Sequence, residues 1–531
     1  MKRLNDLEYL KLSKFQAFLY NLKLFLCAIP VFFKRVGCSI LNFFKECGLG
    51  VKNEFVDIGT TFSEGNWAVK LSFFLFGFGN LYYGQILRGI LFLLFELIFL
   101  VYMFVPFGAG QLGTGLHWLV KGNWFKVGAT VGNQQGGNQV VNDPFFGNMT
   151  VWVDGDDSVK VMLYGLLTII FIVAFIYTWR VQVKQCRLCM NIIASGKKIK
   201  SGKDDMRSLL DDQFHKTLLA LPMTGIMAFT VLPIIYMVLV AFTNYDARHD
   251  GYSNLFSWVG LTNFNELFNF GKGGLGLAFG EILSWTLIWA FFATFSNYFL
   301  GMFVAIMINK KGIKIKKFWR TVLVMTIAIP QFVSLLYVSK LFTTSGIIGK
   351  LLDQIPFIAN YLDANHFVSL WDSPIAAKIL LIVINVWIGI PYIMLMATGI
   401  LMNIPQDLYE SAKIDGASPW QQYSKITLPY MMFVMGPYLL TSFVGNLNNF
   451  NVIYLLTGGN PLNTEIGVAG GASIGHTDLL VTWLFKMTLG SSDTKYYSAS
   501  IIGILVFVVV AALSLIVYNV IPSTKNEEDY K

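Results

Sequence analysis

The chain has 531 residues, of which 55% are hydrophobic and 13% are charged. Soluble proteins carry about 25% charged residues on average, so this chain has too few charges to cover a globular surface. The composition therefore predicts a membrane protein and argues against a cytosolic enzyme or a secreted disulfide scaffold. The formal charge of +9 does not indicate nucleic-acid binding, because basic residues in a membrane protein set its orientation.

Eight stretches are long and apolar enough to cross a bilayer as helices, which takes about 20 residues. The first contains a single ionisable residue, Glu96, and the other seven contain no Asp, Glu, Lys or Arg. The predicted spans are 89–105, 161–179, 217–242, 282–308, 321–338, 379–402, 430–456 and 498–521.

The basic residues are concentrated on one side of these spans. If the N-terminus is cytoplasmic, the inner segments hold 30 of the 40 Lys and Arg, and positive residues are retained inside. Both termini are therefore predicted to be cytoplasmic. The predicted organisation is an inner-surface segment at 1–87, two spans at 88–180 with an outer loop at 106–160, a basic inner loop at 181–216, a core of six spans at 217–521 and a tail at 522–531.

The segment before the first span is predicted to lie on the inner membrane surface. Its apolar run at 24–33 is too short to cross, and the aromatic and basic residues around it are interleaved as in an amphipathic helix. The Gly-containing run at 71–86 is expected to be a second interfacial piece or a re-entrant one. Cys186 and Cys189 form one Cys-x-x-Cys pair, which supplies only half of a structural zinc site, so no metal is predicted.

Ionisable groups are nearly absent from the spans, whereas ion-coupled transporters place such groups inside the membrane. Glu96 is explained at least as well by pairing with a neighbouring polar group as by a coupling role. A neutral, hydroxyl-rich cargo such as a sugar is favoured instead, because two later spans carry neutral polar residues at i, i+4, i+7, which predicts one polar face on each helix. Small and amide residues also hold membrane helices together without any ligand, and spacing alone leaves both explanations open. The two sets are Asn385, Gly389, Tyr392 and Ser442, Asn446, Asn449.

The loop between the sixth and seventh spans, at 403–429, predicts a helix, a turn and a second helix. Pro405 begins the first helix, Asp415 and Gly416 form the turn, Ser418 caps the second helix, and Pro429 ends it. An apolar stripe on a loop outside the bilayer indicates burial against a partner subunit. Its residues are Leu408, Ala412, Trp420, Tyr423 and Ile426.

The same loop resembles the EAA coupling motif of ABC importer permeases. Glu410 and Ala412 flank Ser411, which stands where the motif usually has its middle Ala, and Asp415-Gly416-Ala417 follows. The runs at 385–405, 442–459 and 477–481 are similar to maltose/maltodextrin permease subunits of the MalF type, and the resemblance covers about 300 residues.

The resemblance implies an all-α type I ABC importer permease with eight transmembrane helices in a bacterial plasma membrane. It implies four kinds of partner: a homologous permease of the MalG type, an ATPase homodimer of the MalK type, an extracytoplasmic sugar-binding protein and membrane lipid. ATP is expected on the ATPase subunits, because the sequence has no G-x-x-x-x-G-K-[ST] motif, so this chain is expected to hold no cofactor and not to be an enzyme.

The resemblance also assigns individual residues. It implies that the ATPase is coupled through Glu410, Ala412, Asp415 and Gly416. It implies that sugar is contacted by Asn385, Ile388, Gly389, Tyr392, Ser442, Asn446 and Asn449.

Some positions depart from the family pattern. Gly445 replaces an aromatic residue, Gln331 a small hydroxyl residue and Ile327 a Tyr, so another oligosaccharide or a glycoside is the alternative cargo. The outer segment at 243–281 is short, which favours a binding protein tethered to the membrane by a lipid anchor. A stand-alone secondary transporter, the alternative from another class, is disfavoured by the coupling loop.

Overall fold

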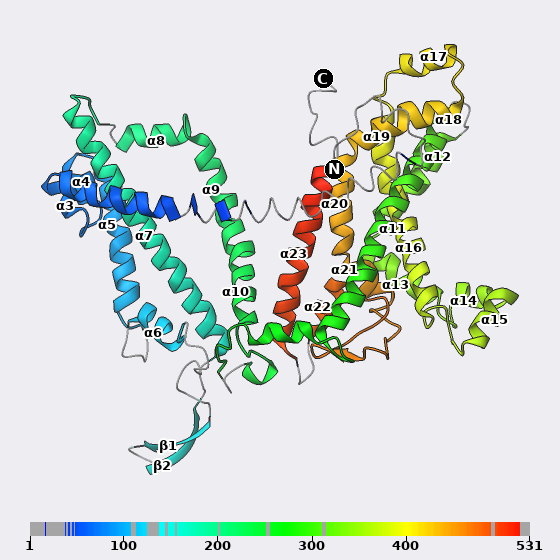
Figure 1. Ribbon diagram of the computed structural model, residues 1–531, viewed down its shortest axis with the longest axis horizontal. Coiled ribbons are helices and arrows are strands. Elements are labelled where there is room, and N and C mark those ends of the chain that lie inside the picture. Colours follow the sequence, from blue (N-terminus) through cyan, green and yellow to red (C-terminus); the bar gives the residue numbers. More distant parts are fainter. Residues whose placement is uncertain are drawn as a thin grey trace. The chain divides into compact units, whose positions relative to one another are not determined.

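The structure is a computed structural model that describes residues 48–107, 113–124, 137–143, 147–153, 157–199, 202–250, 255–310, 315–489 and 494–520, with a few isolated residues before 48. The predicted inner-surface helix at 24–33 and the tail at 522–531 lie outside these residues. The described chain is mostly helical (Figure 1).

The predicted helical membrane fold is confirmed. Among the described residues, six helices are long and apolar enough to cross a membrane, and there are eight candidate spans if each of two bent helix pairs counts as one. Each of the eight predicted stretches overlaps one of these helices or pairs. The six helical spans are 86–104, 158–194, 214–241, 275–309, 374–401 and 496–515.

The fifth and seventh predicted spans are not single helices. Helices α12 (Lys316–Ala328) and α13 (Gln331–Leu341) meet at 94° around Pro330, because a proline lacks the backbone N–H and disfavours helical geometry in the residue before it. In the seventh stretch, the helical segment Pro419–Val434 and helix α20 (Gly436–Leu447) meet at 62°, next to the consecutive residues Gly436 and Pro437.

The chain divides into two compact units. Unit 1 comprises residues 1–117 and 167–223, and unit 2 comprises 118–166 and 224–531. The elements of unit 1, some of which extend past its boundary, are α3 (Trp67–Leu71), α4 (Phe78–Tyr82), α5 (Ile86–Phe104), α6 (Thr114–Lys121), α7 (Ser158–Ala194), α8 (Gly202–Leu210) and α9 (Phe214–Ile226).

Within unit 1, the segment at 71–86 is held between α5 and α7 by polar bonds. The carboxylate of Glu96 accepts a hydrogen bond from the backbone N–H of Phe76 at 2.9 Å. On the other side, the amide of Gln182 donates to the carbonyl of Ser72 and accepts from the N–H of Gly77. Glu96 therefore pairs with a neighbouring polar group, which was one of the two explanations left open.

A helix at 48–64 docks onto the basic end of α7 through ion pairs. Arg180 and Lys184 both contact Glu54, at 2.6 Å each. Arg187 contacts Asp57 at 2.9 Å and Thr61 at 2.8 Å. The hydrogen bonds from Lys184 and Arg180 lower the pKa of the Glu54 carboxyl below its usual value. Part of the N-terminal region is thus bound to the second span by charge.

Unit 2 is built around α11 (Leu275–Asn309), which packs against α16 (Pro374–Leu401) and α20. The helix α23 (Tyr496–Val520) packs against α10 (Leu232–Ala241). The other elements of unit 2 are β1 (Gly137–Asp143), β2 (Gly147–Val153), η1 (Met227–Val231), η2 (Ala247–His249), η3 (Thr262–Phe268), α14 (Ile347–Asp353), α15 (Pro356–Ala364), α17 (Gln406–Ile414), α18 (Pro419–Gln422), η4 (Tyr423–Thr427), α19 (Leu428–Val434), α21 (Phe450–Leu456), β3 (Val468–Ala469), β4 (Ala472–Ser473) and α22 (Leu480–Thr488).

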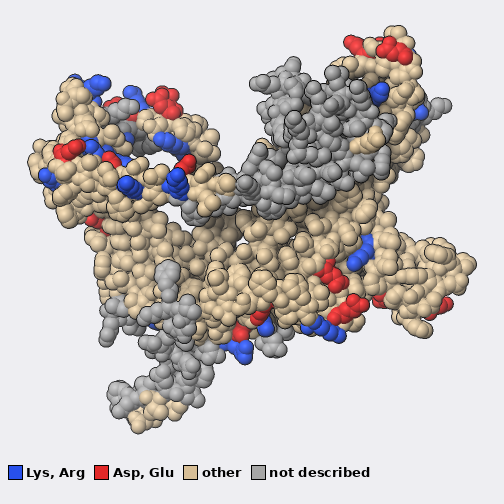
Figure 2. Space-filling model, viewed as in Figure 1, with Lys and Arg blue, Asp and Glu red and all other residues tan. Residues whose placement is uncertain are grey.

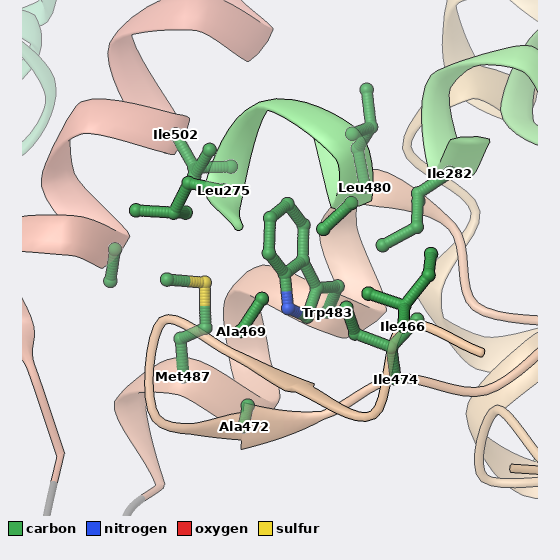
Figure 3. Close-up of a cluster of buried hydrophobic side chains, with 12 residues drawn as sticks. Leu275, Ile282, Ile466, Ala469, Ala472, Ile474, Leu480, Trp483, Met487 and Ile502 are labelled. Atoms are coloured by element: carbon green, nitrogen blue, oxygen red, sulfur yellow. The ribbon is translucent and has the colours of Figure 1, made fainter. Parts of the chain in front are cut away.

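Two antiparallel hairpins, β1–β2 and β3–β4, lie in the loops. The loop that carries β3 and β4 folds over the ends of α11 and α23 around Trp483, which is fully buried (Figure 3). Beside this cluster Asp478 is buried and bonded to Lys486 at 2.7 Å and to the N–H of Gly475 at 2.7 Å. A buried carboxylate persists only when it is paired and hydrogen-bonded, so these contacts fix the loop.

Candidate functional site

A layer of polar side chains crosses the middle of α11 and α16, between two apolar clusters. One cluster contains Trp289 and Leu381, and the other contains Met302 and Ile393. The polar layer lies near the midpoint of both long helices, which is where transporters place their cargo sites. Its polar members are Thr294, Asn297 and Asn385, with Asn446 from α20, and Gly389 lies against Asn297 in the same layer.

Gly389 faces α11 within this layer, and Asn385 precedes it by about one helical turn on α16. Asn385 is 6% exposed, and its Nδ2 has no hydrogen-bond partner among the described residues. A Cβ added to Gly389 would come within 2.3 Å of the Asn297 side chain. Because Gly389 has no side chain, the Asn297 carboxamide fits directly against it, where the sequence predicted contact with sugar.

Asn446 and Asn449 are joined in a chain of hydrogen bonds. Asn446 Nδ2 donates to Thr294 Oγ1 at 3.0 Å, and Asn449 Nδ2 donates to Asn446 Oδ1 at 3.2 Å. Asn449 Oδ1 accepts from the N–H of Val452. Because an amide NH₂ carries two hydrogens, each amide keeps the capacity to donate a second bond.

The prediction that Ser442, Asn446 and Asn449 share one face of one helix is wrong. The helix α20 ends at Leu447, and Asn449 is the N-cap of α21. The short amide side chain of Asn competes for backbone N–H groups and so favours a cap over a helix interior. Ser442 does lie on α20, where it is half-buried and hydrogen-bonded to Tyr438.

Ile388 and Tyr392 line a different space, a small cavity at the break between α12 and α13. Tyr392 is 51% exposed, in contrast to Asn385 on the same helix. The cavity measures about 20 Å³, which holds about one water, so a sugar enters only if the helices separate. Its lining is uncharged and consists of Thr326, Ile329, Gln331, Ser334, Trp387, Ile388 and Tyr392.

The structure thus divides the predicted cargo residues by location. Asn385, Gly389, Asn446 and Asn449 belong to the polar layer or bond to it, Ile388 and Tyr392 line the cavity, and Ser442 lies outside the cavity lining. The structure also adds two polar residues of α11, Thr294 and Asn297, that sequence reasoning missed. The signal was available, since these are polar residues three positions apart in the otherwise apolar span 282–308. Nothing in the sequence indicated which other span they would face.

The loop at 403–429 has the predicted helix, turn and helix. Gly416 has a φ of +76°, a left-handed conformation that favours glycine, and its N–H donates to the carbonyl of Lys413. Ser418 and Gln421 form a capping box at the start of α18. Tyr409 and Thr427 join the two arms through their hydroxyls at 2.8 Å.

One detail of that prediction is wrong, because Pro429 does not end the unit. It lies inside a continuous helical stretch at 419–434, directly after the π-helical segment η4, and the chain continues from this stretch into α20.

Most of the residues predicted to couple the ATPase are accessible at the tip of this loop. Glu410, Asp415 and Gly416 are exposed, and Ala412 is half-buried. Figure 2 shows acidic side chains gathered over α17, where Asp407, Glu410 and Asp415 are all exposed. Large apolar side chains lie beside them, with Ile414 87% and Trp420 72% exposed. The tip therefore offers an apolar and acidic surface to a partner.

No group of three or more His, Cys, Asp or Glu suited to a metal occurs in the described part of the chain. The two thiols of the Cys-x-x-Cys pair contact different side chains. Ser72 donates to Cys186 at 3.6 Å, and Cys189 donates to Gln85 at 3.5 Å.

Comparison with known proteins identifies the family. Residues 297–526 match the family described as the binding-protein-dependent transport system inner membrane component. The maltodextrin transport system permease protein MalC of Streptococcus pneumoniae is 33% identical over 368 residues, which cover 68% of this chain and 82% of that protein. The chain belongs to the binding-protein-dependent transport permeases.

Other relatives in the family differ in the cargo that their names state. The galactooligosaccharides transport system permease protein GanP of Bacillus subtilis is 33% identical over 386 residues, covering 70% of this chain and 87% of GanP. The maltose/maltodextrin permease MalF of Escherichia coli is 32% identical over 260 residues, covering 49% of this chain and 48% of MalF. The resemblance to the maltose/maltodextrin permeases is thereby confirmed.

Membership of the family confirms several predictions. The permease is a multi-pass inner-membrane subunit of an ABC importer that depends on a binding protein. Like these relatives, it is a transport subunit and not an enzyme.

Proposed function

We propose that this permease forms part of the translocation pathway for malto-oligosaccharides in an ATP-driven importer. The observation that carries the proposal is the identity of 33% to a maltodextrin permease over 82% of that relative's length. The uncharged cavity around Tyr392 and the polar layer at mid-membrane support a neutral cargo. Aromatic rings and amides are the groups that bind sugars through stacking and hydroxyl hydrogen bonds.

The proposed cargo contacts are the seven predicted residues. Asn385, Gly389, Asn446 and Asn449 would meet the sugar after α11 and α16 yield space. Ile388, Tyr392 and Ser442 would meet it from the more accessible side.

The proposed partners complete the importer. They are a second permease of the MalG type, two copies of an ATPase of the MalK type and a lipid-anchored extracytoplasmic sugar-binding protein. The ATPase would bind the exposed tip of the loop at 403–429 through Glu410, Ala412, Asp415 and Gly416. We further propose eight spans with both termini in the cytoplasm.

A second candidate cargo is a galacto-oligosaccharide. It is favoured by one observation, the 33% identity to a galactooligosaccharide permease over 87% of that relative. Uptake by the reconstituted complex in proteoliposomes decides between the two. ATP-dependent uptake of maltotriose and maltotetraose, but not of galactosyl trisaccharides, supports the malto-oligosaccharide proposal, and the reverse pattern contradicts it.

The cavity is tested at Tyr392. Replacing it with Leu should raise the KM for uptake at least several-fold, because a stacking ring worth about 1 kcal/mol is lost. Tyr177→Leu is the control, since Tyr177 is an equally large membrane tyrosine, 71% exposed, on α7. Equal effects of the two variants would contradict a cargo role for Tyr392.

The coupling loop is tested at Gly416. Gly416→Val should abolish sugar-stimulated ATP hydrolysis, because a β-branched residue is strained at positive φ and reshapes the tip. Gly196→Val imposes the same strain elsewhere, since Gly196 has a φ of +70° and, like Gly416, has nothing within 4 Å of an added Cβ. Normal ATP hydrolysis in Gly416→Val would remove the coupling role from this turn.

A further inference from the structure

The polar layer between α11 and α16 contains a donor and an acceptor that have no partners. Asn385 Nδ2 and Asn297 Oδ1 are both buried. In the described part of the chain, Asn385 Nδ2 donates no hydrogen bond and Asn297 Oδ1 accepts none. A buried polar atom without a partner is costly, and more so within a membrane, so it calls for an explanation.

The two asparagines are placed about one helical turn apart along the interface. The Asn297 carboxamide packs on Gly389, which follows Asn385 by one helical turn on α16. One turn of four residues advances the helix by about 6 Å, which is also about the span of two consecutive hydrogen bonds through a single oxygen.

A hydroxyl group is suited to bridge them. It donates one hydrogen bond and accepts others, so one hydroxyl oxygen can accept from Asn385 Nδ2 and donate to Asn297 Oδ1. An ion is not suited, because both groups are uncharged amides in an apolar surrounding formed by the two hydrophobic clusters. The missing partner is therefore a neutral, hydroxyl-bearing molecule.

We propose that Asn297 of α11 is a cargo-binding residue of this permease, which together with Asn385 holds one hydroxyl of the transported sugar. The proposal rests on the proposed function of the mid-membrane site and adds to it a residue from a span that carries none of the predicted contacts. In the present arrangement the helices are closed over this layer, and cargo enters between the two amides when α11 and α16 separate.

The test uses the complete importer in proteoliposomes. Asn297→Leu keeps the volume of the side chain and removes both polar atoms. We expect it to raise the KM for sugar at least tenfold with a smaller effect on the maximal rate. Asn309→Leu is the matched control, since Asn309 is also an Asn on α11 that bonds to α16, through Thr398 at 3.1 Å, but lies about three to four turns from the polar layer. It should leave the KM unchanged.

A second measurement separates cargo binding from helix packing. A panel of monodeoxy trisaccharides identifies the hydroxyl whose removal raises the KM of the wild type. The KM for that analogue should rise little further in Asn297→Leu or Asn385→Leu, because the analogue already lacks the same hydrogen bonds. Unchanged KM values for every sugar in Asn297→Leu, or fully additive effects throughout the panel, would overturn the proposal and leave a bridging water as the partner.

The outcome is distinguishable from failure of the proposed function. If the wild-type complex transports galacto-oligosaccharides in place of malto-oligosaccharides, the same comparison is made with deoxygalactosides. If Asn297→Leu does not fold, Asn297→Gln and Asn297→Ser, which keep a neutral acceptor, supply the KM comparison. Asn297→Gln and Asn297→Ser with wild-type KM values would support the acceptor role, and tenfold losses in both would overturn it.

Discussion

Gly301 of α11 lies directly against Ile393 of α16, so that a Cβ on the glycine would come within 2.4 Å of the Cβ of the isoleucine. Membrane helices pack through small residues because lipid provides no hydrophobic drive for their association. This contact sets how closely the two helices that carry the polar layer can approach.

Gly301→Ala should therefore destabilise the permease by about 1–3 kcal/mol through overpacking. The control is Gly280→Ala on the same helix, where nothing lies within 4 Å of the added Cβ. That change should be neutral or stabilise by up to about 1 kcal/mol, because Ala has the better helix propensity. Thermal unfolding of the detergent-solubilised chain measures both, and equal melting temperatures would contradict the close contact.

The hydrogen bond from Asn446 to Thr294 predicts a smaller effect. Thr294→Val keeps the shape and removes the acceptor, which should cost about 0.6–1.7 kcal/mol, the range measured for bonds between membrane helices. Thr321→Val serves as the control, since the exposed Thr321 hydroxyl bonds only to a carbonyl of its own helix. A Thr294→Val variant as stable as the wild type would show that the bond does not hold α20 to α11.

The buried pair of Asp478 and Lys486 predicts a large effect in the loop at 457–479. Lys486→Met leaves an uncompensated carboxylate with no exposed surface, which should cost on the order of 3 kcal/mol. Lys495→Met is the control, because Lys495 is exposed. Limited proteolysis of the loop at 457–479 provides the readout, and equal cleavage in both variants would contradict the prediction.

The loss in Lys486→Met should also depend on pH. Burial raises the pKa of the Asp478 carboxyl above its usual value, so the folded loop binds the proton more tightly than the unfolded loop. Stability then falls as pH rises through the folded-state pKa. Cleavage of the variant should therefore be slower at pH 5 than at pH 8.

The ion pairs between the helix at 48–64 and α7 predict a pH dependence of the opposite sign. Because the pKa of Glu54 is lowered in the folded chain, its contribution is fully present above the usual carboxyl pKa of 4.5 and is lost as the pH falls below it. The protection of residues 48–64 against hydrogen exchange, relative to the intrinsic exchange rate at each pH, should fall below about pH 4.

Salt provides an independent check, because exposed charges are screened. Exchange in 48–64 should also accelerate at about 1 M salt, whereas the α11–α16 interface should be unaffected. Exchange rates that are the same at high and low salt would show that packing, and not charge, holds this helix.

Several features of the site followed directly from local sequence. The turn at Gly416 and the cap at Ser418 depend on residues within a few positions of one another, so the loop was predicted nearly to the residue. Pro429 was misjudged because a proline usually ends a helix, whereas here it follows the π-helical segment η4 inside a continuous helical stretch.

Contacts across the interior did not follow from sequence. Asn297 was missed because its importance comes from Gly389, 92 positions away, which leaves space for its carboxamide. The shared face of Ser442, Asn446 and Asn449 was predicted wrongly because helical spacing assumes an unbroken helix, and Asn449 uses its side chain to begin a new one.

The sequence by itself determined that the chain is a helical membrane protein, where its long apolar segments lie, that the loop at 403–429 folds as helix, turn and helix, and which family it resembles. Those properties depend on hydrophobicity, charge placement and short-range motifs. Only the tertiary structure decided that Asn385 is buried while Tyr392 of the same helix is exposed and lines a cavity, and that Glu96 accepts a hydrogen bond from the backbone N–H of Phe76. The physical reason is that helical periodicity fixes which residues share a face, whereas the neighbour that each face meets depends on packing between distant segments.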